Sequence, residues 1–341
     1  RKARPRDARG SGDPGPRSGG DAGRARAGEA VTGGDVIVDR EPAPAKINLA
    51  LAVTGRRADG YHLLDTLVVH GVAADEIVVE AAPPSADPGE PRIDLAIEGR
   101  FAADLAGDGD NLVVRAARLL AGEARAAGRA VGDLRLTLVK RLPIASGIGG
   151  GSSDAAATLR LLDRVWRLGL ERDRLARLSA PLGADLPMCV AGRPLRATGI
   201  GDALVPVDGL PALSAVLVNP GVAVSTPTVF RALERRDSPS LGPLPTDPTG
   251  LVAAIAAMRN DLEPPARRLA PAIDEVVARL AAEPGCRVAR MSGSGASVFG
   301  LFDDRAAADH AAARLAAARP DWWVAAGTTG ASPGATETSP A

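Results

Sequence analysis

The chain has 341 residues, and its 41 Lys and Arg balance its 41 Asp and Glu, so it is long enough for two domains and carries no net charge. This balance, with only 2% aromatic residues, argues against a nucleic acid or membrane partner, because polyanion-binding proteins usually carry a basic excess and stacking side chains. Two cysteines and three histidines are too few for a metal cluster, and the lack of a long apolar run or signal peptide predicts a soluble, cytoplasmic protein without a membrane span.

The two ends of the chain have the composition of disordered segments. Residues 1–35 are rich in Arg, Gly, Pro and Asp and hold almost no large apolar side chains. Such a segment cannot bury enough surface to offset the entropy of ordering, so we expect a disordered extension. A transit peptide is the alternative, but acidic residues interrupt the segment. Residues 328–341 are similarly poor in core-forming residues, and the same prediction applies to them.

Residues 36–207 have the mixed pattern of a first domain. Residues 46–53 alternate, with Ile47, Leu49 and Leu51 on one face and Lys46 and Asn48 on the other, which predicts a strand. The same reasoning predicts strands over 63–69, 76–80, 93–97 and 134–139, a loop over 82–91, and helices over 111–121 and 153–167.

A glycine-rich loop joins the predicted strand at 134–139 to the helix at 153–167. Four glycines in five residues allow the backbone to turn tightly and bring N–H groups close to a ligand. The loop leads into the first turn of a helix, where unpaired N–H groups and the helix dipole favour an anion. Ser152 and Ser153 can cap the helix or donate to phosphate oxygens. The loop lacks the Lys of a P-loop, and a turn that binds nothing remains an alternative.

A second unit is predicted over residues 208–327. Its pattern gives strands at 215–218, 288–291, 297–302 and 322–325, helices near 227–233 and at 249–258, 266–283 and 304–318, and a surface loop at 237–248. This order favours the α+β class, with helices on one face of each sheet, over strict βαβ repetition.

Four segments resemble the GHMP kinases, the family of galactokinase, homoserine kinase and mevalonate kinase. The glycine-rich segment Pro143–Asp154 resembles their nucleotide loop. The others are Pro44-Ala45-Lys46-Ile47-Asn48-Leu49 with Arg57-Ala58-Asp59-Gly60-Tyr61-His62, then Gly183-Ala184-Asp185-Leu186-Pro187, and Arg290-Met291-Ser292-Gly293-Ser294-Gly295-Ala296. The resemblance covers residues 44–302, with the segments in order and at plausible spacing.

The resemblance implies an α+β, two-domain GHMP kinase fold, with a ribosomal-protein-S5-like N-terminal domain and a ferredoxin-like C-terminal domain. The active site would lie in the cleft between them. The three segments other than the glycine-rich loop narrow the match to members that phosphorylate a cytidine diphosphate alcohol. They imply transfer of the γ-phosphoryl group of ATP to the 2-hydroxyl of 4-diphosphocytidyl-2-C-methyl-D-erythritol, in the non-mevalonate (MEP) pathway to isoprenoid precursors. We expect a monomer or weak homodimer that uses Mg²⁺ bound through the nucleotide phosphates.

The resemblance assigns the catalytic roles to Asp185 and Lys46. The Asp matching Asp185 contacts the acceptor hydroxyl and is the proposed general base, whereas without the family match this Asp would be taken to stabilise its own turn. The Lys matching Lys46 lies beside the hydroxyl and the Asp, where its charge assists deprotonation. An ordinary surface Lys, with its ammonium in water, is the alternative for Lys46.

The remaining predicted site residues bind substrate or nucleotide. The resemblance places Tyr61 on the cytosine base by stacking and His62 by hydrogen bonding, and Phe230 is the candidate for the opposite stacking face. Asn48 and the turn Gly293-Ser294-Gly295 are further substrate-binding candidates. The predicted ATP site comprises Pro143, Ile144, Ala145, Ser146, Gly147, Ile148, Gly149, Gly150, Gly151, Ser152, Ser153, Asn111 and Leu112, although a helix cap explains Asn111 equally well.

Two other functions are compatible with the same segments. The first is another GHMP kinase acting on a different alcohol, but a cytidine-binding pair at Tyr61 and His62 would have no purpose with homoserine or mevalonate. The second is a catalytically inactive relative that binds a ligand, against which the presence of both Lys46 and Asp185 argues.

Overall fold

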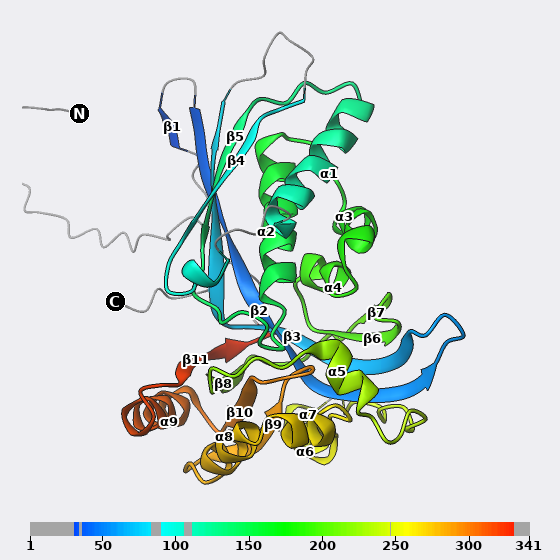
Figure 1. Ribbon diagram of the computed structural model, residues 1–341, viewed down its shortest axis with the longest axis vertical. Coiled ribbons are helices and arrows are strands. Elements are labelled where there is room, and N and C mark those ends of the chain that lie inside the picture. Colours follow the sequence, from blue (N-terminus) through cyan, green and yellow to red (C-terminus); the bar gives the residue numbers. More distant parts are fainter. Residues whose placement is uncertain (1–30, 34–35, 83–89, 106–110, 246, 331–341) are drawn as a thin grey trace, which may run out of the picture.

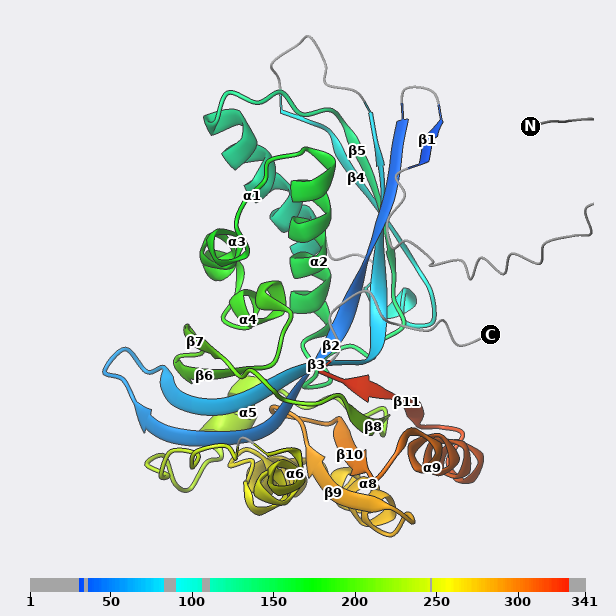
Figure 2. The same ribbon diagram turned by 180° about the vertical axis from the view of Figure 1, so that it is seen from behind.

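The computed structural model describes residues 31–33, 36–82, 90–105, 111–245 and 247–330. The predicted disordered segments lie outside these ranges, apart from two short parts. Residues 31–33 form β1 (Val31–Gly33), and Thr328 and Thr329 belong to β11 (Trp323–Thr329). Two units are stacked along the long axis of the molecule, as Figures 1 and 2 show. Among the described helices, none has the length and apolar character needed to cross a membrane.

A long hairpin runs through both units. It is formed by β2 (Val36–Arg56) and β3 (His62–Ala81), which pair antiparallel along nearly their whole length. The sequence predicted β3 as two strands, 63–69 and 76–80, whereas the structure joins them across Gly71. This residue has a φ of 129°, which glycine tolerates because it has no Cβ. Irregularities in the register of β2, including one between Pro44 and Lys46, accompany the bend of the hairpin.

The first unit is a sheet covered on one face by helices. Four further strands extend the sheet around the hairpin: β4 (Ile93–Glu98), β5 (Leu134–Val139), β6 (Leu195–Gly199) and β7 (Ala203–Pro206). On one face lie α1 (Leu112–Ala126), α2 (Gly150–Val165), α3 (Arg172–Ser179) and α4 (Leu186–Ala191) (Figure 1). An apolar core lies between them, with Ile77 and Leu136 of the sheet against Leu120 and Leu159 of α1 and α2.

The second unit has the ferredoxin-like strand order. Its antiparallel sheet runs β11, β8 (Leu213–Asn219), β10 (Val298–Phe302) and β9 (Cys286–Met291), which is 4-1-3-2 in chain order. The helices between strands are α5 (Thr226–Arg231), α6 (Pro248–Ala257), α7 (Glu263–Leu269), α8 (Ala272–Ala281) and α9 (Arg305–Ala318). The predicted single helix at 266–283 is two helices because Pro271, which has no N–H to donate, separates α7 from α8. The predicted α+β class is confirmed.

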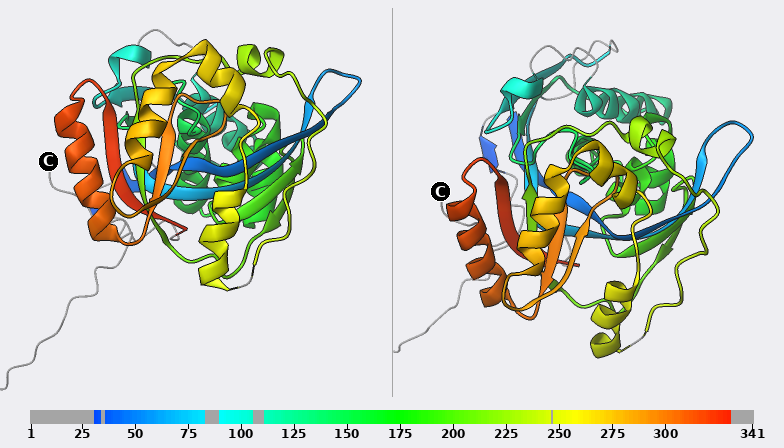
Figure 3. Two further views of the ribbon diagram at one scale, coloured as in Figure 1. Left: turned by 90° about the horizontal axis from the view of Figure 1, so that it is seen from below. Right: turned by 60° about the horizontal axis from the view of Figure 1, so that its bottom comes forward.

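The two units share a sheet and a core. Thr329 at the end of β11 pairs with Gly71 of β3, so the second sheet continues the first. Ile47 and Leu67 of the hairpin pack in one cluster with Leu217 and Phe299 of the second unit. Figure 3, seen from below, shows the hairpin passing across the second unit. The polar residues of β2 around Lys46 therefore lie at the junction of the units.

Candidate active site

Lys46 and Asp185, 139 residues apart in the chain, form an ion pair. Lys46 Nζ donates to Asp185 Oδ2 over 2.8 Å. The Lys46 side chain is only 6% exposed, whereas that of Asp185 is 43% exposed. Asp185 stands at the first turn of α4, after a bend at Gly183 and before Pro187, so the backbone fixes its position. The pair therefore presents a carboxylate to solvent while the ammonium lies behind it.

The glycine-rich loop packs directly against Lys46. The backbone N–H of Lys46 donates to Ile148 O over 2.9 Å, which ties the loop to β2. Gly149 has a φ of 69°, and a Cβ there would lie 3.1 Å from Lys46 Cβ. Glycine is required at this position for both its backbone conformation and its size. The loop thus brings its last residue to within contact of the ion pair.

The start of α2 has the geometry of an anion-binding cradle. The helix begins at Gly150, three residues before the predicted start, because glycine has a poor helix propensity and concealed the first turn. The first helical hydrogen bond of α2 is donated by Ser153 N to Gly149 O, and Gly149 offers no side-chain cap. The N–H groups of residues 150–152 therefore precede the helical ladder and are available to an anion, with the helix dipole behind them.

The side chains of the predicted ATP loop divide into inward-facing and outward-facing groups. Ser146 Oγ donates to Pro143 O, and Ser153 Oγ lies 3.6 Å from the buried Cys189 Sγ, so both hydroxyls are used inside the protein. Ile148 is also buried. Ser152 is half-buried. A ligand would consequently meet backbone more than side chain along this loop.

Asn111 is the N-cap of α1. Its Oδ1 accepts a hydrogen bond from Val113 N over 2.9 Å, so the capping explanation of Asn111 holds. Its neighbour Leu112 lies next to the loop, because its Cδ1 would be 3.6 Å from a Cβ on Gly151. The start of α1 thus borders the nucleotide loop, and adenine contact by these two residues remains a prediction.

The turn Gly293–Gly295 of the second unit contacts the nucleotide loop itself. Ser292 Oγ donates to Gly147 O, and a Cβ on Gly293 would lie 2.8 Å from the same oxygen. Ser292 Oγ also accepts from Asn48 N over 3.1 Å. The predicted substrate turn therefore contacts the predicted ATP loop as well, and Ser292 joins three of the four sequence motifs. Ser292 was absent from the predicted site, although it lies within the motif that predicted its neighbours.

Two further contacts fix the polar side chains of this region. Asn48 Nδ2 donates to Thr66 Oγ1 over 2.8 Å, while its Oδ1 is buried without a hydrogen-bond partner in the described structure and lies beside Gly293. Ser294 Oγ is 2.7 Å from Thr226 Oγ1 at the start of α5. Asn48 thus retains a free acceptor at the junction of the two units.

His62, rather than Tyr61, faces Phe230. The two rings stack with centroids 4.7 Å apart and an interplanar angle of 25°. Tyr61 is 59% exposed, because it lies in the hairpin turn next to the start of β3, where successive side chains point to opposite sides. Burial, and then the charges of Arg56 and Arg236, lower the pKa of His62, which leaves a neutral ring able to recognise a polar base edge.

A buried ionic cluster lies beneath the start of α2, and no local sequence pattern predicted it. Lys140, just after β5, donates to Asp75 Oδ2 of β3 over 2.5 Å and to Asp154 Oδ2 of α2 over 2.7 Å. These contacts are long-range, and a Lys between a strand and a loop is ordinarily a surface residue. The cluster settles the direction of Asp154, whose carboxyl points away from the cradle and toward Lys140.

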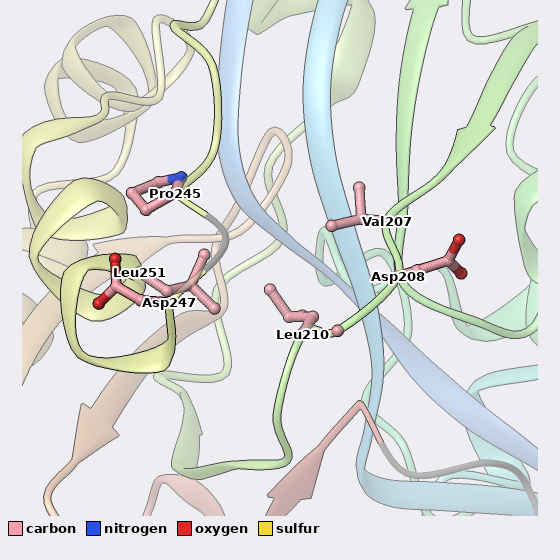
Figure 4. Close-up of a pocket in the computed structure, with 7 residues that line it drawn as sticks. Val207, Asp208, Leu210, Pro245, Asp247 and Leu251 are labelled. Carbon is pink, nitrogen blue, oxygen red and sulfur yellow. The ribbon is translucent and has the colours of Figure 1, made fainter.

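A separate surface hollow lies between the segment after β7 and the start of α6 (Figure 4). It is lined by Val207, Asp208, Gly209, Leu210, Pro245, Asp247 and Leu251. None of the predicted site residues lines it. Within the described residues, no group of three or more His, Cys, Asp or Glu side chains is arranged to hold a metal ion.

The GHMP kinase class is defined by two joined units. One is an S5-like unit with a glycine-rich anion cradle, and the other is a ferredoxin-like unit whose glycine turn contacts that cradle. Family models agree, since the model described as "GHMP kinases N terminal domain" matches residues 111–193 and "GHMP kinases C terminal" matches 249–321. Solved homoserine kinase from Cytophaga hutchinsonii shares this fold, with a TM-score of 0.61, 17% identity and coverage of 88% of this chain and 97% of that one.

Closer relatives specify the family further. Proteins named 4-diphosphocytidyl-2-C-methyl-D-erythritol kinase from Sinorhizobium medicae and Cereibacter sphaeroides are 50% and 51% identical to this chain. The alignments cover 84% and 83% of this chain and 94% and 96% of those proteins. A crystal structure of 4-(cytidine 5'-diphospho)-2C-methyl-D-erythritol kinase matches with a TM-score of 0.67 and 37% identity, covering 86% of this chain and 99% of that one. The chain belongs to the 4-diphosphocytidyl-2-C-methyl-D-erythritol kinase family of GHMP kinases.

Proposed function

We propose that this protein transfers the γ-phosphoryl group of ATP to the 2-hydroxyl of 4-diphosphocytidyl-2-C-methyl-D-erythritol, the step of the MEP isoprenoid pathway that its relatives' name describes. The observation that carries the proposal is the ion pair of Lys46 and Asp185 in contact with the end of a glycine-rich phosphate cradle. Relatives at about half identity over most of the chain share one name, which favours this substrate over the alcohols of other GHMP kinases.

Phosphoryl transfer requires mainly positioning and the stabilisation of charge on the moving group. The free N–H groups at residues 150–152 and the dipole of α2 would hold the nucleotide phosphates. Mg²⁺ would enter with ATP, bound mostly through phosphate oxygens, and would offset their charge. The half-exposed Asp185 carboxylate would then accept the proton of the acceptor hydroxyl, while the Lys46 ammonium stabilises the negative charge that develops on that oxygen.

The cytidine end of the substrate would bind at the stacked pair of His62 and Phe230. The cytosine ring could stack on the outer face of one of these two rings or take the place of one of them. The neutral imidazole of His62 can donate a hydrogen bond to the edge of the base or accept one from it. The exposed Tyr61 would close over the base from the hairpin turn. Asn48, whose Oδ1 has no hydrogen-bond partner among the described residues, would orient the sugar alcohol.

The domain arrangement, cellular location and oligomeric state are proposed from the sequence composition. Two domains, 36–207 and 208–327, would enclose the substrate, and the protein would act in the cytoplasm as a monomer or weak homodimer. The balanced charge supports a small-molecule substrate without a nucleic acid partner. Gel filtration at several protein concentrations measures the oligomeric state, and elution as a tetramer or larger assembly would contradict it.

The test is ADP release from ATP with and without the cytidine substrate, and with homoserine or mevalonate in its place. We expect ADP release only when the cytidine substrate is present with ATP. Turnover with another alcohol would support the related-kinase alternative, and binding without turnover would support an inactive ligand-binding protein. Asp185→Asn should lower kcat by at least about 100-fold with little change in ATP affinity. The matched control is Asp173→Asn, an exposed position on α3, which should leave kcat unchanged.

A further inference from the structure

Three ionisable side chains are buried together behind the phosphate cradle. Lys140 is 3% exposed and contacts two carboxylates, Asp75 at 2.5 Å and Asp154 at 2.7 Å, which are 0% and 3% exposed. The cluster lies directly beneath the first residue of α2, because a Cβ on Gly150 would come within 3.0 Å of Lys140 Nζ. Any charge in the cluster therefore acts on the same N–H groups that face an anion, with little water between.

The two carboxylates of the cluster have unequal support. Asp75 is fully engaged, since its Oδ1 accepts backbone N–H groups from Arg141 and Leu142 and its Oδ2 accepts from Lys140. Asp154 Oδ2 accepts from Lys140 alone, and its Oδ1 is buried with no hydrogen-bond partner in the described structure. One ammonium can neutralise only one of the two carboxylates. Because Asp75 accepts more hydrogen bonds, any uncompensated negative charge in the cluster lies on Asp154.

Desolvation raises the pKa of Asp154 well above its ordinary value, and the neighbouring Asp75 raises it further, while Lys140 opposes both. The groups that face Asp154 from the packed elements are Lys140 after β5 and Asp75 of β3. On α4, the Cys189 thiol near Ser153 is neutral, because burial raises its pKa to about 12. The Lys46–Asp185 pair lies against Gly149 instead.

We infer that Asp154 controls the affinity of the cradle for nucleotide phosphates through its charge. When its carboxyl is neutral, the cluster carries no net charge and the helix dipole acts unopposed on the phosphates. When the carboxyl is ionised, a buried negative charge stands behind the cradle and weakens phosphate binding. The inference rests on the proposed function in that it takes the cradle to bind ATP. It assigns Asp154 a positioning and electrostatic role without contact to the substrate.

The experiment compares wild type with Asp154→Asn, which has the same shape but no charge. The dissociation constants of a non-hydrolysable ATP analogue and of adenosine are measured by calorimetry, with Mg²⁺ present, from about pH 5.5 to about pH 9. At each pH, the dissociation constant of wild type is divided by that of the variant, so the ionisation of the analogue itself cancels. Asp154→Ala provides a second uncharged variant, and thermal unfolding verifies that both are folded. The control is Glu76→Gln, the same charge change at a more exposed position next to Asp75.

We expect the variants to bind the analogue more tightly than wild type by about tenfold at the upper end of the pH range, with the ratio shrinking as pH falls. Adenosine, which has no phosphate, should bind all proteins alike. Equal affinity for the analogue across the range would overturn the inference, as would an equal gain in adenosine binding or the same gain in Glu76→Gln. Failure of wild type to bind the analogue at any pH would instead overturn the proposed function.

Discussion

A buried histidine beside the ion pair makes the stability of the protein sensitive to acid. His70 of β3 pairs with Lys46 in the sheet register and is 3% exposed. Neither ring nitrogen makes a hydrogen bond of normal geometry within the described residues. Burial, with the nearby charges of Arg160 and Lys46, lowers the pKa of His70 from 6.5 to about 3. The folded protein therefore keeps this ring neutral.

The sign and size of the effect follow from linkage. Because the pKa is lower in the folded state, the stability that His70 contributes is complete above about pH 6.5 and is lost as pH falls toward 3. With these two values the loss between pH 8 and pH 5 is roughly 2 kcal/mol, a large part of the net stability of a typical domain. Protonation would add a third positive charge beside Lys46 and Arg160, so the loss begins at the candidate active site.

The perturbation is His70→Leu, which removes the titrating group and leaves an apolar side chain of similar size. Equilibrium urea unfolding at pH 8 and pH 5 gives the free energy of unfolding for both proteins. Between the two conditions the variant should lose about 2 kcal/mol less than wild type. The control is His310→Gln, an exposed position on α9, which should follow wild type. If His70→Leu and wild type lose the same stability on acidification, the reasoning from burial is refuted.

Three further predictions concern the loop, the cluster and the cytidine end. Gly149→Ala should cost about 1–2 kcal/mol in backbone strain and should lower kcat by at least tenfold, because the added Cβ would contact Lys46. The control Gly128→Ala, at a φ of 72° with open space around the added Cβ, should show the backbone strain without the loss of kcat. Equal kcat in the two variants would contradict a role for the contact with Lys46. Lys140→Met should lower the free energy of unfolding in urea by about 3–5 kcal/mol by leaving two buried carboxylates unpaired, and a loss below about 1 kcal/mol would refute it. Phe230→Ala should raise KM for the cytidine substrate several-fold and leave KM for ATP unchanged; equal increases would exclude a specific stacking role.

Local pattern was sufficient where large apolar residues alternate strictly along a strand or an apolar stripe extends over several helical turns. The alternating strand at 134–139 and the helix at 304–318 lie at their predicted places, the helix within one residue. Pattern failed for α3, α4, β6 and β7, which have four to eight residues and no repeated alternation or stripe of large apolar side chains. The hairpin was divided for a different reason, since Gly71 within β3 has the local signature of a turn.

The candidate catalytic pair was predicted from family resemblance and not from periodicity. No local signal relates Lys46 to Asp185, and a Lys on a strand or an Asp on a turn is ordinary by itself. Their contact at 2.8 Å depends on how α4 is placed against β2. Arg160 of α2 fixes that placement by donating to Cys189 O of α4 and to Glu41 of β2. Such three-element clamps are properties of the folded chain and could not be predicted from either segment.

The two glycine-rich motifs appeared in the sequence as separate binding loops, and the structure makes them sterically dependent on each other. A Cβ on Gly147 would lie 2.6 Å from Ser292 O, and a Cβ on Gly293 would lie 2.8 Å from Gly147 O. Each glycine is therefore needed partly because the other backbone occupies the space. Ser297 N also donates to Ser146 O, so the nucleotide loop is hydrogen-bonded to the second unit as well as to β2. A shift of the second unit on binding the cytidine substrate would move the nucleotide loop with it, which gives the two substrates a direct physical route by which each can affect the binding of the other.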